Sequence, residues 1–319
     1  MDLALQNLIS PIVLCFVLGA VARWVKSDFE LPDAVYQSLS IYLLLAIGLK
    51  GGVAVAETPI KDLLGPAMVT LVLGVLTPLS AYFLMRKAGK ISQTDAAATA
   101  AHYGSVSAVT FLASIEAAKM AGMETEGYLA ALVALLEVPG IIVGLILARG
   151  KGSGSLGTAV HDVLTGKSIF LLIGGLVIGT ACGAQKIDAV APFFIDPFKG
   201  VLCLFLLELG TVAAGRMRDM TQAGWRLVAL GCFIPAVHGL IGTFAGVMVG
   251  MSPGGAAVLG AMVGSASYIA APAAVRIALP EASPGIYLTL ALGITFPFNL
   301  LVGIPLFLRT AEWLATLSL

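Results

Sequence analysis

Long apolar runs, interrupted by short polar stretches, follow one another along almost the whole chain. A helix needs about 20 mostly apolar residues to cross a bilayer. By that rule we expect ten membrane-spanning helices, five in each half, which we number as spans 1 to 10: 8–25, 33–56, 62–86, 93–119, 126–148, 167–184, 194–215, 223–249, 254–278 and 285–309. The pattern therefore predicts an all-α polytopic membrane protein.

The composition also indicates a chain that lies mostly in lipid. Hydrophobic residues make up 59% of the 319 positions and charged residues 11%, against about 25% charged residues in a soluble domain. The net charge is zero and basic stretches with interleaved aromatics are absent, so nucleic acid is not an expected partner. The four cysteines lie apart in apolar runs, which argues against a disulfide framework or a zinc site.

The two halves of the chain carry similar motifs. The stretch Gly104-Ser105-Val106-Ser107 returns 160 positions later as Gly264-Ser265-Ala266-Ser267, and Tyr128 with Gly144 returns as Tyr287 with Gly303. Because each half holds an odd number of spans, the second half begins on the opposite side of the membrane. This arrangement predicts two five-helix repeats of inverted topology, a plan typical of secondary transporters.

The repeats define the expected domains and their orientation. We expect a first repeat at 1–149, a short glycine-rich linker at 150–166 and a second repeat at 167–319. Most of the 18 Lys and Arg residues lie in the linker and in the loops after odd-numbered spans. The positive-inside rule places these segments in the cytoplasm, so we expect a multi-pass protein of the plasma or inner membrane with both termini outside.

Spans 4 and 9 are the polar spans, and we expect both helices to be broken at the repeated serine motif. Pro272 suits the first turn of a restarted helix, with Ser267 to Ala271 as the unwound link. Freed helix N-termini can bind an anion, while unwound carbonyls and hydroxyls can coordinate sodium. The alternative is ordinary helix packing, because Gly, Ser and Pro are common in membrane helices.

A few ionisable residues lie inside spans, where a charge costs about 2.5–3.5 kcal/mol on insertion scales and needs a partner or a water-filled cavity. Lys50 and Glu137 are either contacts of a substrate or ion, or a structural ion pair, and the residues leave both interpretations open. Glu208 is expected to be structural. His102 adjoins the first serine motif, so it is either a site residue or a hydrogen-bonded core residue.

Several motifs together resemble the sodium-dependent bicarbonate transporter family, best known from cyanobacteria. They are Ser265–Pro272, Ile47–Gly52, Pro235–Gly239 and Gly303–Phe307, and they spread over nearly the whole chain. The resemblance implies that broken spans 4 and 9 cross and hold sodium and substrate. It also implies a core domain of spans 3–5 and 8–10, a gate domain of spans 1, 2, 6 and 7, and a homotrimer.

The chain departs from the cyanobacterial pattern at three positions that bear on the site. Tyr268 stands where those members typically have an aspartate, Ala270 where they have a serine, and Lys50 where they have a small polar residue. Cyanobacterial members also have a long central linker associated with a regulatory partner protein. The linker of this chain is short, so such a partner is not indicated.

These observations favour a sodium-coupled symporter of a small anion, bicarbonate or a related small carboxylate, with sodium as the coupling ion and no other cofactor. The expected sodium ligands are Ser105, Ser107, Ser265 and Ser267, and the remaining candidates for substrate or ion contact are Gly104, Gly264, Tyr268, Ala270, Pro272, Lys50, Glu137 and His102. An organic-anion carrier of the bile-acid symporter type is the alternative. An intramembrane enzyme is remote, because the sequence has no H-E-x-x-H or G-x-S-x-G motif.

Overall fold

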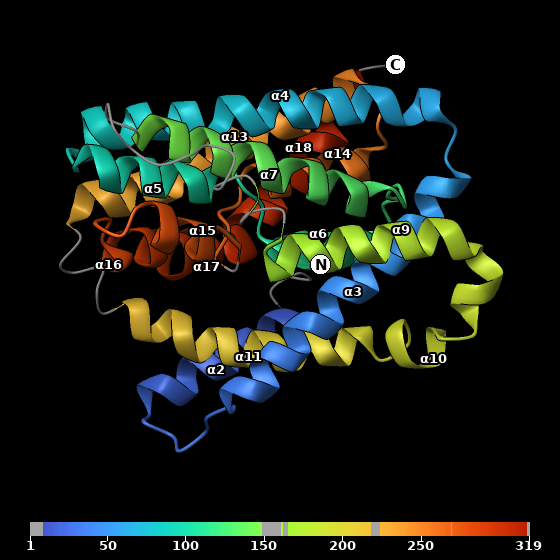
Figure 1. Ribbon diagram of the computed structural model, residues 1–319, viewed down its shortest axis with the longest axis horizontal. Coiled ribbons are helices and arrows are strands. Elements are labelled where there is room, and N and C mark those ends of the chain that lie inside the picture. The colour runs from blue at the N-terminus through green and yellow to red at the C-terminus, as the bar shows by residue number, and fades with distance from the viewer. Residues whose placement is uncertain (1–8, 149–160, 162–164, 218–223, 269, 318–319) are drawn as a thin grey trace.

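The computed structural model describes residues 9–148, 161, 165–217, 224–268 and 270–317, and this part of the chain is helical without strands. The expected linker therefore lies almost wholly outside the described residues. In Figure 1, α4, α5, α7 and α13 to α18 form the upper part of the molecule, and α2, α3, α10 and α11 form the lower part.

The described residues of the first half form six α-helices. They are α2 (Pro11–Trp24), α3 (Asp33–Glu57), α4 (Ile60–Leu84) with the π-helical turn η1 (Met85–Gly89), α5 (Gln93–Tyr103), α6 (Ala108–Met120) and α7 (Leu129–Ala148). Ser92 caps α5 and Ser107 caps α6, each by accepting a hydrogen bond from a backbone N–H of the first turn.

The described residues of the second half begin with six further α-helices. They are α9 (Lys167–Asp188), α10 (Ala191–Phe194), α11 (Phe198–Met217), α13 (Trp225–Met248), α14 (Pro253–Val263) and α15 (Ala270–Ala278). The last helical run joins α16 (Pro284–Leu288), η2 (Thr289–Thr295), α17 (Phe296–Phe298), η3 (Asn299–Gly303) and α18 (Ile304–Leu317).

Seven helices or uninterrupted helical runs in the described part are long and apolar enough to cross a membrane. Span 4 is broken between α5 and α6, at the predicted Gly104–Ser107 motif. Span 9 is broken as well, but the predicted limits of its link, Ser267 to Ala271, are wrong. Helix α14 already ends at Val263, and α15 begins at Ala270. Pro272 does lie in the first turn of the restarted helix, as predicted.

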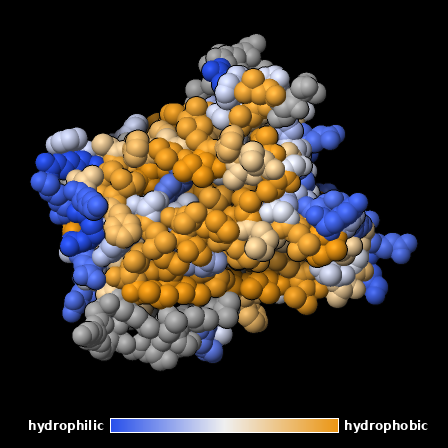
Figure 2. All heavy atoms as spheres, turned by 90° about the horizontal axis from the view of Figure 1, so that it is seen from above, coloured by the Kyte–Doolittle hydropathy of each residue, from blue (hydrophilic) through white to orange (hydrophobic). Residues whose placement is uncertain are grey.

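The outer surface is apolar along the middle of the molecule. Figure 2 shows a hydrophobic band between two hydrophilic ends. On α4, Met68, Val72 and Leu76 follow one another at four-residue spacing and are 59%, 51% and 53% exposed. Side chains at this spacing share one helix face, and an exposed apolar face of this extent is suited to lipid. The protein is therefore a multi-pass membrane protein.

Close glycine contacts join α3 to α9. A Cβ atom on Gly175 would lie 2.9 Å from the Cα of Gly48 and 3.0 Å from the carbonyl oxygen of Leu45. The neighbouring Gly174 points elsewhere, and a Cβ there would meet no described atom within 4 Å. Gly175 is thus required by packing in this membrane helix, whereas Gly174 is not.

Replacing Gly175 with alanine should therefore destabilise the protein, while Gly174→Ala should not. The added methyl group at Gly175 pushes α3 and α9 apart, and overpacking of this kind costs about 1–3 kcal/mol. Thermal unfolding of the purified protein in detergent measures the difference. Equal midpoints for the two variants would contradict the packing role of Gly175.

Candidate ion and anion site at the two helix breaks

The two helix breaks contact each other through two hydrogen bonds, each donated by a backbone N–H. The Ser107 N–H donates to Ser265 Oγ at 2.8 Å, and the Ser267 N–H donates to the carbonyl oxygen of His102 at 2.8 Å. In an apolar environment each freed backbone group must find a partner inside the protein. Each break therefore satisfies backbone groups of the other, which fixes the two motifs side by side.

Glu137 joins the two breaks from a third helix. Its Oε1 accepts hydrogen bonds from Ser105 Oγ at 2.9 Å and from Ser267 Oγ at 3.3 Å. The side chain lies on α7 and is only 5% exposed. Helix α7 reaches this position because Gly140 has no side chain, since a Cβ there would collide with the backbone of Gly104.

A small cavity of about 10 Å³ lies where these groups meet. This volume is close to that of a single water-sized occupant. Its lining residues include Ser107, Glu137 and Ser267, which have side-chain oxygen atoms. The complete lining is Leu44, Val106, Ser107, Ala108, Glu137, Ser267 and Tyr268. We call this space the central cavity. Helix α6 begins beside it, so the positive end of a helix dipole faces the cavity.

The four predicted sodium ligands fall into two groups. Ser107 and Ser267 line the central cavity, whereas Ser105 and Ser265 lie behind it. Ser105 donates to Glu137, and Ser265 accepts from the backbone of Ser107 and donates to the carbonyl of Met262 at 2.7 Å. The structure therefore places two serines as direct candidates and two as supports for the cavity wall.

The glycines that open the two motifs serve close packing. A Cβ on Gly104 would lie 2.7 Å from the Cβ of Pro78, and one on Gly264 would lie 2.5 Å from the carbonyl oxygen of Pro235. Prolines within α4 and α13 thus press on the two breaks at related places. Neither glycine lines the central cavity.

His102 takes part in the contact between the two breaks through its backbone carbonyl and not through its ring. The ring is fully buried, and Nδ1 lies 2.7 Å from the carbonyl oxygen of Ala98. It also packs against the Tyr287 ring with centroids 4.6 Å apart. The His102 carbonyl oxygen accepts from Ser267, so the residue supports the break without lining the cavity.

Lys50 is exposed and lies in a different cavity from Glu137. That cavity has a volume of about 160 Å³, and its lining also includes Glu116, Glu126 and Lys199. Lys199 forms a salt bridge with Glu116 there. The structure therefore does not bring the Lys50 ammonium into the central cavity with the Glu137 carboxylate.

The remaining candidates lie on the other side of the central cavity. Tyr268 lines both the central cavity and a neighbouring cavity of about 240 Å³, which Pro272 also lines. Ala270 begins α15. Asn299, which the sequence reasoning missed, donates from Nδ2 to the Gly264 carbonyl at 2.8 Å. A buried amide in an apolar run is the signal that would have pointed to it.

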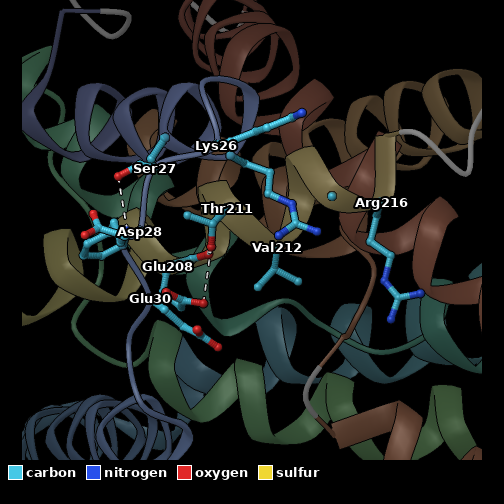
Figure 3. Close-up of a pocket in the computed structure, with 12 residues that line it drawn as sticks. Lys26, Ser27, Asp28, Glu30, Glu208, Thr211, Val212 and Arg216 are labelled. Carbon is cyan, nitrogen blue, oxygen red and sulfur yellow. Dashed lines mark hydrogen bonds between the residues drawn. The ribbon is translucent and has the colours of Figure 1, made fainter.

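The cavity beyond Tyr268 adjoins a larger one of about 770 Å³ at the end of α2 and α11. Figure 3 shows Glu208, Thr211 and Arg216 of α11 at this larger cavity. Glu208 accepts from the Leu31 N–H and from Thr211 Oγ1, both at 3.3 Å. Glu208 therefore joins α11 to the segment that precedes α3.

The fold and the two contacting helix breaks define a membrane transporter. A model of the Na⁺-dependent bicarbonate transporter superfamily matches residues 11–312, and the chain belongs to this superfamily. Membership confirms the resemblance carried by the motifs and makes the protein a sodium-dependent transporter rather than an enzyme. A search among curated proteins finds no match.

Ser265→Ala should destabilise the protein more than Ser114→Ala. The first change leaves the buried Ser107 N–H without its acceptor, at a cost of about 1–3 kcal/mol for an unsatisfied buried group. Ser114 is a matched control because its buried hydroxyl donates only to the carbonyl of Phe111 in its own helix, at 2.7 Å. Thermal unfolding in detergent is the measurement, and equal stabilities would show that the contact between the breaks contributes little.

Proposed function

We propose that the protein is a sodium-coupled symporter of a small anion, bicarbonate or a related small carboxylate. The observation that carries the proposal is the buried Glu137 carboxylate, which binds a serine from each of two contacting helix breaks beside a small cavity. Discontinuous helices that meet inside the protein are the usual place for substrate and coupling-ion sites in secondary transporters.

The groups at the central cavity suit a sodium ion. Ser107, Ser267 and Glu137 offer oxygen atoms only, which hard cations prefer over nitrogen or sulfur. The carboxylate supplies a negative charge at a buried position, where a cation would lower the cost of keeping it ionised. Described residues contain no cluster of three or more His, Cys, Asp or Glu, so a transition-metal site has no support from this part of the chain.

The central cavity holds one water-sized occupant in this structure, so an anion beside the cation requires it to widen, and the helix ends around it suit an anion. The N-terminus of α6 begins at Ala108, which lines the cavity, and α15 restarts two residues after Tyr268. Positive ends of helices attract anions. The small volume, together with Leu44 and Val106 in the wall, favours a small anion over the large organic anions of the bile-acid type.

The packing of the helices supports the inverted repeat. A Cβ on Gly19 would collide with Leu207 of α11 and approach Gly210, and one on Gly179 would collide with Leu49 of α3 and approach Gly52. Gly19 and Gly179 are 160 positions apart, and Gly52 and Gly210 are 158 apart. The contact of α2 with α11 thus has its counterpart in the contact of α9 with α3.

We infer ten spans from this symmetry, which adds α2 and the two broken spans to the seven long helical runs. The spans form repeats at 1–149 and 167–319, a core domain of spans 3–5 and 8–10, and a gate domain of spans 1, 2, 6 and 7. We further propose a homotrimer in the plasma or inner membrane, with the basic loops in the cytoplasm and both termini outside.

Uptake into proteoliposomes tests the coupling. An inward sodium gradient should drive accumulation of labelled bicarbonate or a small carboxylate such as acetate, because the ion and the anion share one cavity. A panel that also contains pyruvate and a bile acid separates the small-anion proposal from the alternative. Equal uptake when potassium replaces sodium would rule out sodium coupling.

Glu137→Gln tests the role of the carboxylate directly. Gln keeps an acceptor oxygen for the two serines but removes the charge, so the half-saturating sodium concentration should rise about tenfold, equivalent to a loss of about 1.4 kcal/mol. Glu116→Gln is the control, since that carboxylate pairs with Lys199 in another cavity. Unchanged sodium dependence in folded Glu137→Gln protein would remove Glu137 from the sodium site.

A further inference from the structure

The 770 Å³ cavity, the 240 Å³ cavity and the central cavity form a row, because each shares lining residues with the next. Tyr268 lies at one of the two boundaries between them. Glu208, Val212 and Arg216 line both the 770 Å³ cavity and the 240 Å³ cavity, so these two spaces adjoin along one face of α11. We call the 240 Å³ cavity, lined by Tyr36, Arg216, Tyr268, Arg276 and Leu292 among others, the antechamber. Tyr268 is the residue that the antechamber shares with the central cavity.

The Tyr268 ring is held by an aromatic contact, but its hydroxyl is poorly satisfied. The ring packs edge-to-face against Phe296 with centroids 5.5 Å apart. The hydroxyl is buried beside Ser107 without forming a hydrogen bond of good geometry. Leaving a buried hydroxyl unsatisfied is unfavourable. An arrangement in which this hydroxyl meets water or an anion would therefore compete with the observed one.

The antechamber has the chemistry of a passage for an anion. Arg216 and Arg276 supply guanidinium groups to its lining, and guanidinium groups pair with carboxylate-like anions. Of the two acidic residues in the lining, Glu208 is engaged with the Leu31 N–H and the Thr211 hydroxyl, and Asp33 is the second. An anion that crosses from the central cavity to this side must pass the Tyr268 ring.

The first repeat has a small residue at the position that corresponds to Tyr268. The residue that corresponds to Tyr268 at a shift of 160 is Ala108, whose methyl group lines the central cavity. At the shift of 159 that relates Tyr128 to Tyr287, Glu137 corresponds to Phe296. The second repeat thus replaces a small residue and a carboxylate with two aromatic rings in contact.

We propose that the Tyr268 ring is the gate between the central cavity and the arginine-lined antechamber. The inference rests on the proposed function for what passes the gate, but the gate itself is a property of the two cavities. Rotation of the ring away from Phe296 opens the way, and its size in the closed position excludes anions from the central cavity. Such a gate fits a lid that sequesters a site from one side.

Thiol labelling at position 108 tests the gate without requiring transport. Ala108→Cys places a small thiol in the central cavity, and a membrane-impermeant thiol reagent is added to right-side-out or inside-out vesicles. Mass spectrometry of the peptide that contains position 108 separates its labelling from that of the native cysteines. Combining Ala108→Cys with Tyr268→Ala should accelerate labelling at least tenfold, and in only one of the two vesicle preparations. A tenfold change in rate corresponds to a barrier lower by about 1.4 kcal/mol.

Three variants keep the result interpretable. Tyr268→Phe retains the ring and should label slowly, whereas Tyr268→Leu should label fast and serves if the alanine variant does not fold. Tyr36→Ala is the matched control, since Tyr36 lines the antechamber but not the central cavity, and it should leave labelling slow. No acceleration, equal acceleration in both preparations, or acceleration by Tyr36→Ala would overturn the gate. Lack of sodium-dependent uptake with the expected labelling would overturn only the proposed function.

Discussion

One buried carboxylate holds the centre of this protein together. Glu137 accepts from Ser105 in the first broken span and from Ser267 in the second, and the breaks also bind each other through the backbone of Ser107 and Ser267. A broken helix inside a membrane protein is tolerated only when its freed polar groups find partners. The two breaks therefore depend on each other, and the close approach of α7 at Gly140 depends on both.

Sequence patterns predicted the main features of this arrangement for physical reasons. Apolar run length predicted ten membrane-spanning helices, and seven helical runs in the described residues are long and apolar enough to cross a membrane. Glycine with serine in mid-span marked both breaks. The predicted limits of the second break were wrong, and at its actual start a contact comes from a residue distant in the sequence. Asn299 donates to the Gly264 carbonyl, and this contact lies outside any local pattern. Likewise, Lys50 and Glu137 look alike as intramembrane charges, yet they line different cavities because of how α3 and α7 pack.

The proposed internal repeat would explain the position of the candidate site but not its chemistry. Symmetric packing, such as Gly19 on α11 and Gly179 on α3, builds similar frames from the two halves. Within that frame the residues differ, because Glu137 corresponds to Phe296 and Ala108 to Tyr268. The wall of the central cavity consequently holds the Glu137 carboxylate from the first half and the Tyr268 ring from the second, and the Tyr268 ring packs against Phe296. If Tyr268 is the gate proposed above, this asymmetry gives the two directions of access different barriers.

The same asymmetry bears on why a cation and an anion would share the cavity. A buried carboxylate strongly disfavours a second negative charge nearby, because the interior screens charges weakly. A sodium ion at Glu137 would offset that repulsion, and once the cavity widens the anion could bind between the ion and the N-terminus of α6. Binding of each would strengthen binding of the other, as linkage requires. On the proposed function, coupling therefore arises from the electrostatics of one small cavity, and it needs no contact between distant sites.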